Sequence, residues 1–257
     1  MTLSNEERII IKNTIKECIR NKFRAYSPES KHMPFHFSLI GKDRMALFSF
    51  IHSLNTTFGT SIFEPVAERI ARTRFKTAQK QYVVGRVISE KSQQVIQEII
   101  DNLTDGREPD KEKEIKKISE VSRKPPFRST RPVKADLFLE DENGSVYLID
   151  IKTAKPNISG FKDYKRTLLE WIAIFQNSHE NIDANSIIAI PYNPYEPEPY
   201  QRWTIRGMID LKKELLVAEE FWNFLGGEGA YEQVLDCFEN AGIELRPEID
   251  EYFSRFK

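Results

Sequence analysis

Hydrophobic side chains recur at close to helical spacing through the first hundred residues of the chain. Ile15, Ile19 and Phe23, for example, stand four residues apart among charged residues, a pattern typical of an amphipathic helix. Pro65 fits the first turn of a later helix, and two prolines and a glycine predict a loop over 28–42. The helices predicted for this part of the chain cover residues 5–24, 43–55, 59–82 and 83–103.

The pattern changes to β-like runs past the middle of the chain. Segments 133–139 and 146–152 are rich in β-branched and large apolar residues, and Asn143-Gly144 between them favours the tight turn of a β-hairpin. The charged segment 104–124, which precedes the hairpin and is poor in large apolar residues, is predicted to be an exposed connector. After the hairpin we expect a helix, a short buried strand and further helices, over 159–177, 186–190 and most of 207–256.

These elements predict an α/β fold in which a small central mixed β-sheet is flanked by helices. A chain of 257 residues fits one large domain or a compact domain with a helical extension, and we expect one integrated domain. It divides into a helical N-terminal region that packs on the core, a charged connector with a basic end, the core itself, and an acidic helical C-terminal region. These regions cover residues 1–104, 105–131, 132–206 and 207–257.

The composition is that of a soluble globular protein, with 40% hydrophobic and 30% charged residues. No apolar run reaches the roughly 18 residues that a membrane span needs, and the first residues are too polar for a signal peptide. We therefore expect a cytoplasmic protein without membrane contact. Cys18 and Cys237 lie far apart in sequence and outside any Cys or His cluster, which argues against a disulfide framework and a structural zinc site.

The formal net charge of −1 conceals an uneven distribution of charge. Residues 207–257 carry 12 acidic and 5 basic side chains, a net charge of −7, which leaves +6 for residues 1–206. One part of the molecule can therefore face a polyanion while the whole chain stays near neutral.

The predicted hairpin carries two carboxylates and a lysine: Asp136, Asp150 and Lys152. Because side chains alternate faces along a strand, Asp150 and Lys152 project to the same side. Carboxylate oxygens bind Mg²⁺, and a lysine can orient a water and offset the negative charge that builds on a phosphorane. The group therefore fits phosphodiester hydrolysis. The same spacing also arises elsewhere in this highly charged chain, and a solvated hairpin face is the alternative interpretation.

These residues resemble the signature of the PD-(D/E)xK nuclease superfamily, in which an Asp is followed, after a variable gap, by Asp/Glu-x-Lys on a β-hairpin. Asp136, Asp150 and Lys152 match it, and Ala135 stands where the superfamily often has Pro. Two longer stretches, beginning at Phe58 and at Asp150, are similar to type II restriction endonucleases of the TdeIII type. The resemblance implies a restriction-endonuclease-like core, Mg²⁺ bound by Asp136 and Asp150, and Lys152 as the residue that assists the attacking water.

The resemblance further implies sequence-specific cleavage of double-stranded DNA by a homodimer, since a two-fold protein reads a palindromic site and cuts both strands. Two alternatives stay open. One is a repair or recombination nuclease of the same fold that reads DNA structure. The other is a DNA-binding module without catalysis, in which the carboxylates do not meet.

Glu64 is a candidate third metal ligand, because the resembled nucleases often add a glutamate from an upstream helix. The stretch Ser61-Ile62-Phe63-Glu64 also matches a helix capping box, and Glu64 directly before Pro65 could itself stand at the helix start. The sequence leaves both roles open.

A basic stretch without any acidic residue precedes the hairpin, between Val121 and Lys134. Beside the proposed site it fits a track for DNA phosphates, which lysines of the following helix, including Lys165, would extend. A solvated basic linker is the alternative. Arg202 belongs to a Pro- and aromatic-rich loop, 192–203, that suits base or dimer contacts or, equally, covers the core. The predicted DNA-binding residues are Arg123, Lys124, Arg128, Arg131, Lys155 and Arg202.

Overall fold

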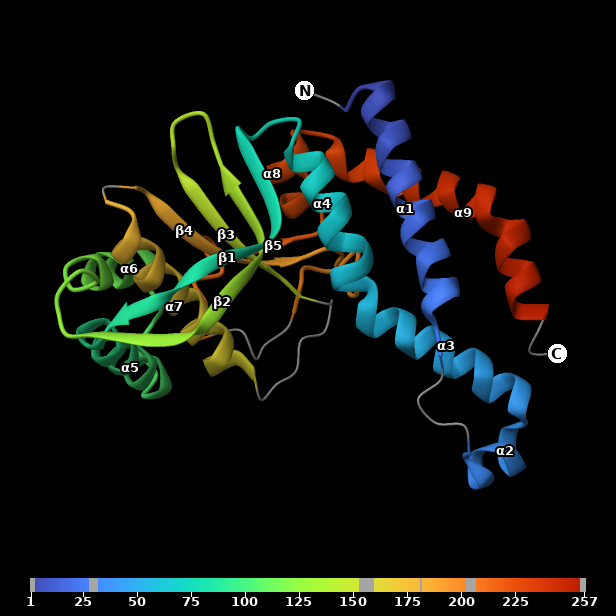
Figure 1. The fold of residues 1–257 in the computed structure, drawn as a ribbon, viewed down its shortest axis with the longest axis horizontal. Coiled ribbons are helices and arrows are strands. Elements are labelled where there is room, and N and C mark those ends of the chain that lie inside the picture. The colour runs from blue at the N-terminus through green and yellow to red at the C-terminus, as the bar shows by residue number, and fades with distance from the viewer. Residues whose placement is uncertain (1–2, 28–31, 153–159, 181, 202–206, 255–257) are drawn as a thin grey trace.

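The computed structural model describes residues 3–27, 32–152, 160–180, 182–201 and 207–254. Within them a five-stranded β-sheet lies between layers of helices (Figure 1). The strands are β1(Thr77–Ser89), β2(Phe127–Glu140), β3(Val146–Ile151), β4(Ala184–Ile190) and β5(Leu215–Val217). The helices are α1(Asn5–Ala25), α2(Pro34–Ile40), α3(Lys42–Phe58), the π-helical turn η1(Gly59–Phe63), α4(Glu64–Ala71), α5(Glu90–Thr104), α6(Lys111–Ser119), α7(Phe161–Ser178), α8(Glu219–Gly226) and α9(Ala230–Ser254).

The sheet is mixed, and its strands lie side by side in chain order. β1, β2 and β3 are antiparallel neighbours, whereas β3, β4 and β5 run parallel. The turn between β2 and β3 follows the Asn-Gly signal, because Gly144 has a φ of 83° and the Asp141 carboxylate accepts hydrogen bonds from the N–H groups of Asn143 and Ser145, both at 2.9 Å. The predicted mixed sheet and its hairpin are therefore confirmed.

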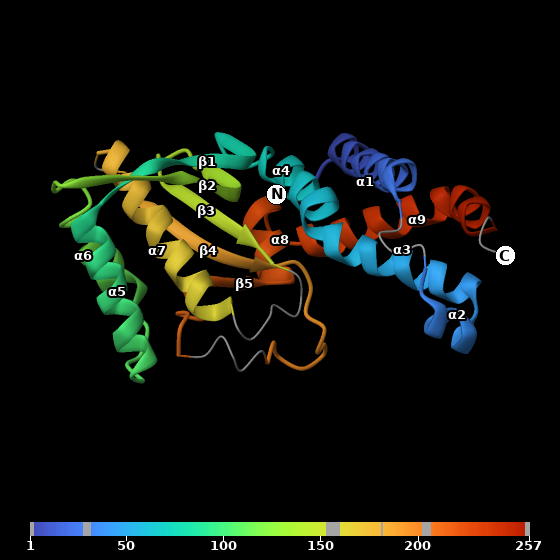
Figure 2. The ribbon, with the colours of Figure 1, turned by 60° about the horizontal axis from the view of Figure 1, so that its bottom comes forward.

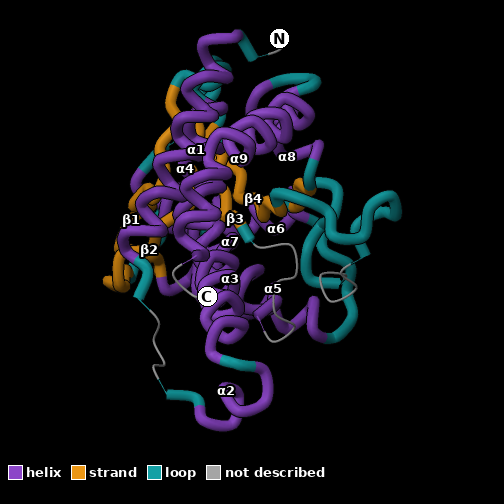
Figure 3. The backbone as a smooth tube through the Cα atoms, turned by 90° about the vertical axis from the view of Figure 1, so that its right-hand side faces the viewer, coloured by secondary structure: helices purple, strands orange, loops and turns teal. Residues whose placement is uncertain are grey.

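A separate hydrophobic core buries each face of the sheet. One core joins the sheet to α5, α6 and α7 and includes Leu148 and Trp171. The other joins it to α1, α4, α8 and α9 and includes Val66, Ile149 and Trp222. The neighbours Leu148 and Ile149 enter opposite cores, as strand alternation requires. The tube view shows α1, α4 and α9 over one side of the sheet (Figure 3), so the sheet is the middle of three layers.

Acidic side chains of the C-terminal helix α9 form ion pairs with basic side chains of the N-terminal helix α1. Arg20 of α1 lies 2.6 Å from Glu248 of α9, and Lys12 and Lys16 reach Glu244 at 2.5 and 2.6 Å. Such partly exposed ion pairs contribute little stability each. They show, however, that some of the negative charge of residues 207–257 is balanced within the molecule.

β1 lies where parts of the helices 59–82 and 83–103 are predicted, so the prediction is wrong for this strand. Val83, Val84, Val87 and Ile88 satisfy helical spacing, but these β-branched residues suit a strand at least as well. This segment forms a strand because it pairs with β2, which follows much later in the chain. The first of these two predicted helices is confirmed only over 59–71, as η1 and α4, and the second only after Ser89, as α5. The helices predicted over 5–24, 43–55 and 159–177 and the strand over 186–190 are confirmed.

Three shorter elements also differ from the prediction. α2 lies in the predicted loop 28–42, β5 lies among the predicted C-terminal helices, and α6 lies in the segment expected to be an exposed connector. α6 is anchored by Lys111, which is 4% exposed and whose Nζ donates to the carbonyls of Ser186 and Lys213 at 2.9 and 2.8 Å. Burial lowers the pKa of Lys111 to about 8.

The views from two directions place α2 and α3 at the end of the molecule away from α5 and α6 (Figures 1 and 2). Among the described residues, none of the helices combines the length and the apolar character of a membrane-spanning segment.

Candidate active site

The two predicted aspartates lie where β2 and β3 begin to separate. Leu137 pairs with Ile149, so Asp136 and Asp150 occupy the next opposite positions on the two strands. Asp136 Oδ2 accepts a hydrogen bond from the N–H of Ile151 at 2.9 Å, and Asp150 is 5% exposed. The two carboxylates lie close enough for the negative charge of Asp150 to raise the pKa of Asp136. The hairpin thus brings both carboxylates together in a largely buried place.

Lys152 follows directly after β3 and reaches the same group. Its Nζ lies 2.7 Å from Asp150 Oδ1 and 4.9 Å from the centre of the Tyr164 ring. Its backbone N–H donates to the Ala189 carbonyl at 2.9 Å, which ties the residue to β4. The ammonium group is therefore held both by a carboxylate and by an aromatic face.

Glu64 lies in a helical run, near enough to the aspartates for their charges to interact. α3, η1 and α4 follow one another without a break, no side chain caps α4, and the N–H of Glu64 bonds to the Gly59 carbonyl. The capping-box interpretation of Glu64 is therefore wrong. Glu64 is 2% exposed, and its Oε2 accepts a hydrogen bond from Gln81 Nε2 at 2.8 Å. We call Glu64, Asp136 and Asp150 the carboxylate cluster.

Burial and repulsion between like charges raise pKa values in the carboxylate cluster. The pKa of Asp136 rises to about 7, first because burial disfavours its charged form and then because Asp150 carries negative charge nearby. Burial also raises the pKa of Glu64, and the hydrogen bond from Gln81 acts in the opposite direction. The cluster therefore retains a proton up to about neutral pH in the absence of a bound cation.

The donor chemistry of the cluster fits a hard divalent cation. Among the described residues, no group of three or more His, Cys, Asp or Glu side chains is already arranged to hold a metal ion. The three carboxylates nevertheless come from three different elements, and repulsion by the Asp150 carboxylate raises the pKa values of both Glu64 and Asp136, while Lys152 forms its ion pair with Asp150. A cation bound by carboxylate oxygens would relieve this repulsion and displace the retained proton.

Three of the predicted DNA-binding residues are exposed near or on β2. Lys124 precedes the strand, and Arg128 and Arg131 belong to it. Arg131 is five residues from Asp136 along the same strand, and a strand rises about 3.3 Å per residue, so the two lie roughly 16 Å apart. Exposed cations at this distance can contact phosphates of a duplex that reaches the carboxylate cluster.

The other three predicted DNA-binding residues either form an ion pair within the protein or lie outside the described part of the chain. Arg123 is exposed but forms an ion pair with Glu180. Lys155 and Arg202 lie outside the residues that the structure describes.

Lys165 was expected among the lysines that extend the phosphate track, and this expectation is wrong. Its side chain is fully buried, with Nζ 2.5 Å from Glu114 Oε2 and 2.6 Å from Glu214 Oε2. Buried charges persist where they are paired and hydrogen-bonded. This group ties α7 to α6 and to the turn before β5, so it is a link within the fold rather than a DNA contact.

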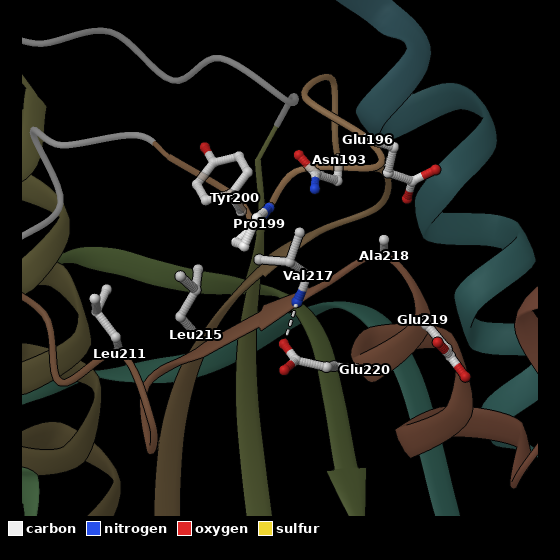
Figure 4. A pocket seen from close by; sticks show the side chains of 10 residues that line it. All are labelled: Asn193, Glu196, Pro199, Tyr200, Leu211, Leu215, Val217, Ala218, Glu219 and Glu220. Atoms are coloured by element: carbon white, nitrogen blue, oxygen red, sulfur yellow. Dashed lines mark hydrogen bonds between the residues drawn. The ribbon is translucent and has the colours of Figure 1, made fainter.

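The aromatic loop before position 202 is held by its own side chains. Asn193 Nδ2 donates to the Glu198 carbonyl at 2.7 Å, and Asn193 Oδ1 accepts from the N–H of Tyr195 at 3.0 Å. Beside the loop, a pocket of about 370 Å³ lies against β5 and the start of α8 (Figure 4). No member of the carboxylate cluster lines this pocket, so it is not the candidate active site.

Two residues that contact the site are missing from the sequence prediction. The sequence predicts a helix at Gln81, and that prediction gives no indication that Gln81 contacts Glu64. Tyr164 lies in a correctly predicted helix, but nothing in the spacing of that helix indicates a contact with Lys152. Both contacts depend on how elements pack rather than on a local motif.

The mixed sheet between helical layers, with the carboxylate-bearing hairpin in it, defines a restriction-endonuclease-like core. A family model described as type II restriction endonuclease, HinfI, matches residues 3–242. The chain belongs to this HinfI family of type II restriction endonucleases, which are site-specific deoxyribonucleases. The resemblance to type II restriction endonucleases is therefore confirmed, whereas the TdeIII subtype is not.

Relatives that are similar to this chain over most of its length are also described as type II restriction enzymes. The type II restriction enzyme MjaII of Methanocaldococcus jannaschii is 30% identical, over 91% of this chain and 69% of the relative. The type II restriction enzymes HgiCII and HgiEI of Herpetosiphon aurantiacus are 27% and 25% identical over 88% of this chain, and the match covers 83% and 82% of their lengths. These similarities favour a type II enzyme over the two alternatives that the sequence left open.

Proposed function

We propose that the chain is a Mg²⁺-dependent restriction endonuclease of the PD-(D/E)xK type that cleaves double-stranded DNA. Asp136, Asp150 and Lys152 are its catalytic residues, and Glu64 joins the two aspartates as a metal ligand. The observation that carries the proposal is the ion pair of the buried Asp150 with Lys152 beside a second, partly buried carboxylate, that of Asp136, where β2 and β3 separate. A DNA substrate also makes the cytoplasm the proposed place of action.

The residues of the site have different roles in hydrolysis. Bound Mg²⁺ supplies Lewis-acid stabilisation of the charge that develops on the phosphate and favours deprotonation of water. The N–H of Ile151 fixes the Asp136 carboxylate, which gives up its proton when it becomes a ligand. Lys152, held by Asp150, orients the attacking water and offsets negative charge on the phosphate.

Six basic residues are proposed to bind the DNA backbone. Contacts of this kind position a duplex without reading its sequence, and they weaken as salt concentration rises. The proposed residues are Arg123, Lys124, Arg128, Arg131, Lys155 and Arg202.

The enzyme is proposed to act as a homodimer, and α2 and α3 offer a surface for the second copy. Phe35 and Leu39 of α2 are each 85% exposed, and Phe48 of α3 is 58% exposed. With Ile40, Leu47 and Ile51, these side chains supply on the order of 500–700 Å² of apolar surface per chain, at about 150–200 Å² for a large side chain. A stable interface buries about 800 Å² per partner, so this surface provides most of what a dimer needs.

The test is cleavage of an unmethylated plasmid of known sequence, with and without Mg²⁺, by the parent protein and by Asp150→Ala. We expect discrete Mg²⁺-dependent fragments from the parent and none from Asp150→Ala, while DNA binding without Mg²⁺ stays measurable in both. Asp250→Ala, which removes an exposed carboxylate from α9, is the matched control and should cut like the parent.

Each other outcome of this experiment contradicts a definite part of the proposal. Discrete fragments from Asp150→Ala would remove this carboxylate from the catalytic site. A cleavage ladder on unrelated duplexes would favour a nuclease that reads DNA structure. Salt-sensitive DNA binding without cleavage by the parent would favour a non-catalytic module.

A further inference from the structure

Gln81 stands in the same row of the sheet as the two aspartates. Lys80 pairs with Leu137 and Tyr82 pairs with Ala135, so Gln81 occupies the position of β1 opposite Asp136 on β2. Asp136 in turn stands opposite Asp150 on β3. Three neighbouring strands thus place Gln81 beside the carboxylate cluster.

The backbone of Gln81 has an unusual conformation at this position. Its φ is 53°, in the left-handed region that side-chain-bearing residues rarely adopt and glycine adopts easily. Non-glycine residues persist in this conformation where their surroundings impose it, and such residues are concentrated at functional sites. The conformation therefore suggests that the Gln81 side chain has a role at the site.

The Gln81 side chain has a clear partner in the cluster. Its Nε2 donates a hydrogen bond of 2.8 Å to Oε2 of Glu64, which is almost completely buried. This contact spans two elements, because Glu64 lies in α4 and Gln81 in β1. A glutamate side chain has several rotatable bonds, so a donor from a neighbouring strand restricts the direction of its carboxylate.

We propose that Gln81 is a positioning residue that fixes the Glu64 carboxylate in its orientation toward Asp136 and Asp150. The inference rests on the proposed function, in which Glu64 is a metal ligand. Partners that orient metal ligands typically change metal affinity about 10- to 100-fold when they are removed. Gln81 is an exposed residue of β1, and its left-handed backbone is then the conformation that directs its amide at Glu64.

The first test is Mn²⁺ binding in the absence of DNA, followed by the electron paramagnetic resonance signal of free Mn²⁺. Gln81→Leu should weaken Mn²⁺ binding at least tenfold. Gln79→Leu makes the same change two residues earlier on β1, at a position that is exposed as Gln81 is, and should bind Mn²⁺ like the parent. Parent-like Mn²⁺ binding by Gln81→Leu would overturn the inference.

A second pair of variants separates the side chain from the backbone. Gln81→Gly lacks the same amide as Gln81→Leu but accepts a positive φ, so it should melt roughly 2–4 °C higher than Gln81→Leu and bind Mn²⁺ equally weakly. Ala218→Gly is the control, because Ala218 has a φ of 49° and should gain stability on substitution without a change in Mn²⁺ binding. Parent-like Mn²⁺ binding by Gln81→Gly would overturn the inference.

Variants at Glu64 distinguish failure of this inference from failure of the proposed function. If Gln81 acts through Glu64, adding Gln81→Leu to Glu64→Gln should weaken Mn²⁺ binding no further than Glu64→Gln alone does. Additive losses would overturn the positioning role and leave Glu64 as a ligand. A Glu64→Gln variant that binds Mn²⁺ and cleaves DNA like the parent would instead remove Glu64 from the proposed site.

Discussion

Replacing Asp136 by Asn tests the electrostatics of the carboxylate cluster directly. The pKa of Asp136 is raised from 3.8 to about 7 by burial and by the nearby Asp150, so the folded protein keeps a proton that the unfolded chain releases above about pH 4. A raised folded-state pKa favours the folded state at low pH, and this advantage is lost as the pH rises through about 7. Asn cannot titrate, and its carbonyl can still accept the hydrogen bond from Ile151.

The magnitude follows from the pKa of Asp136. From pH 5 to about pH 7, the folded parent keeps the Asp136 proton and the unfolded chain does not, so the unfolding free energy falls by about 1.36 kcal/mol per pH unit. By pH 8.5 the parent has therefore lost about 2–3 kcal/mol of unfolding free energy relative to pH 5. Without metal, Asp136→Asn should therefore gain about this much stability relative to the parent over that pH range. The variant should also be inactive in cleavage, since it lacks a proposed catalytic carboxylate.

The assay is urea unfolding in EDTA at pH 5 and pH 8.5, followed by tryptophan fluorescence. Asp250→Asn is the control and should follow the pH dependence of the parent. Addition of Mg²⁺ at pH 8.5 should stabilise the parent but not Asp136→Asn, because ligand binding to the folded state alone adds stability. A stability difference between parent and Asp136→Asn that is the same at both pH values would refute the electrostatic reasoning.

Three further predictions concern the fold, the DNA contact and the dimer. Lys165→Met should lower the unfolding free energy by about 3–5 kcal/mol in urea denaturation, because Glu114 and Glu214 lose their buried cation; a loss below about 1 kcal/mol would contradict this. Arg128→Ala should reduce the salt dependence of DNA binding by about one phosphate contact in fluorescence anisotropy, whereas an unchanged slope would remove Arg128 from the DNA surface. Phe35→Asp should convert the proposed homodimer to a monomer in analytical ultracentrifugation, and a dimer formed by Phe35→Asp would exclude this surface as the interface.

The parts of the site that follow from sequence are those encoded locally. The Asn143-Gly144 turn fixes the hairpin, and strand alternation then determines that Asp150 and Lys152 share a face. These rules involve residues close together in the chain, and the structure follows them. The roles of these residues in catalysis remain predictions that the proposed experiments test.

The parts that could not be predicted depend on contacts between distant segments. The spacing of β1 predicts a helix, and its pairing with β2 makes it a strand instead. Gln81 contacts Glu64 because α4 packs beside β1. The sequence predicts that Lys165 faces solvent, whereas in the structure it is buried between Glu114 and Glu214. Hydrophobic spacing does not specify which distant element supplies a partner, so such contacts become visible only in the folded protein.

The irregular course of β1 also affects how the protein behaves at high concentration. β1, with 13 residues, is one of the two edge strands of the sheet, and strands of other molecules can add to a long, regular edge strand. Its pairing with β2 shifts register on both sides of Gly85, the backbone at Gln81 is left-handed, and Lys80 and Arg86 are exposed. These features interrupt the row of free backbone groups that an incoming strand needs, so the same irregular strand that brings Gln81 to Glu64 also protects the molecule from aggregation.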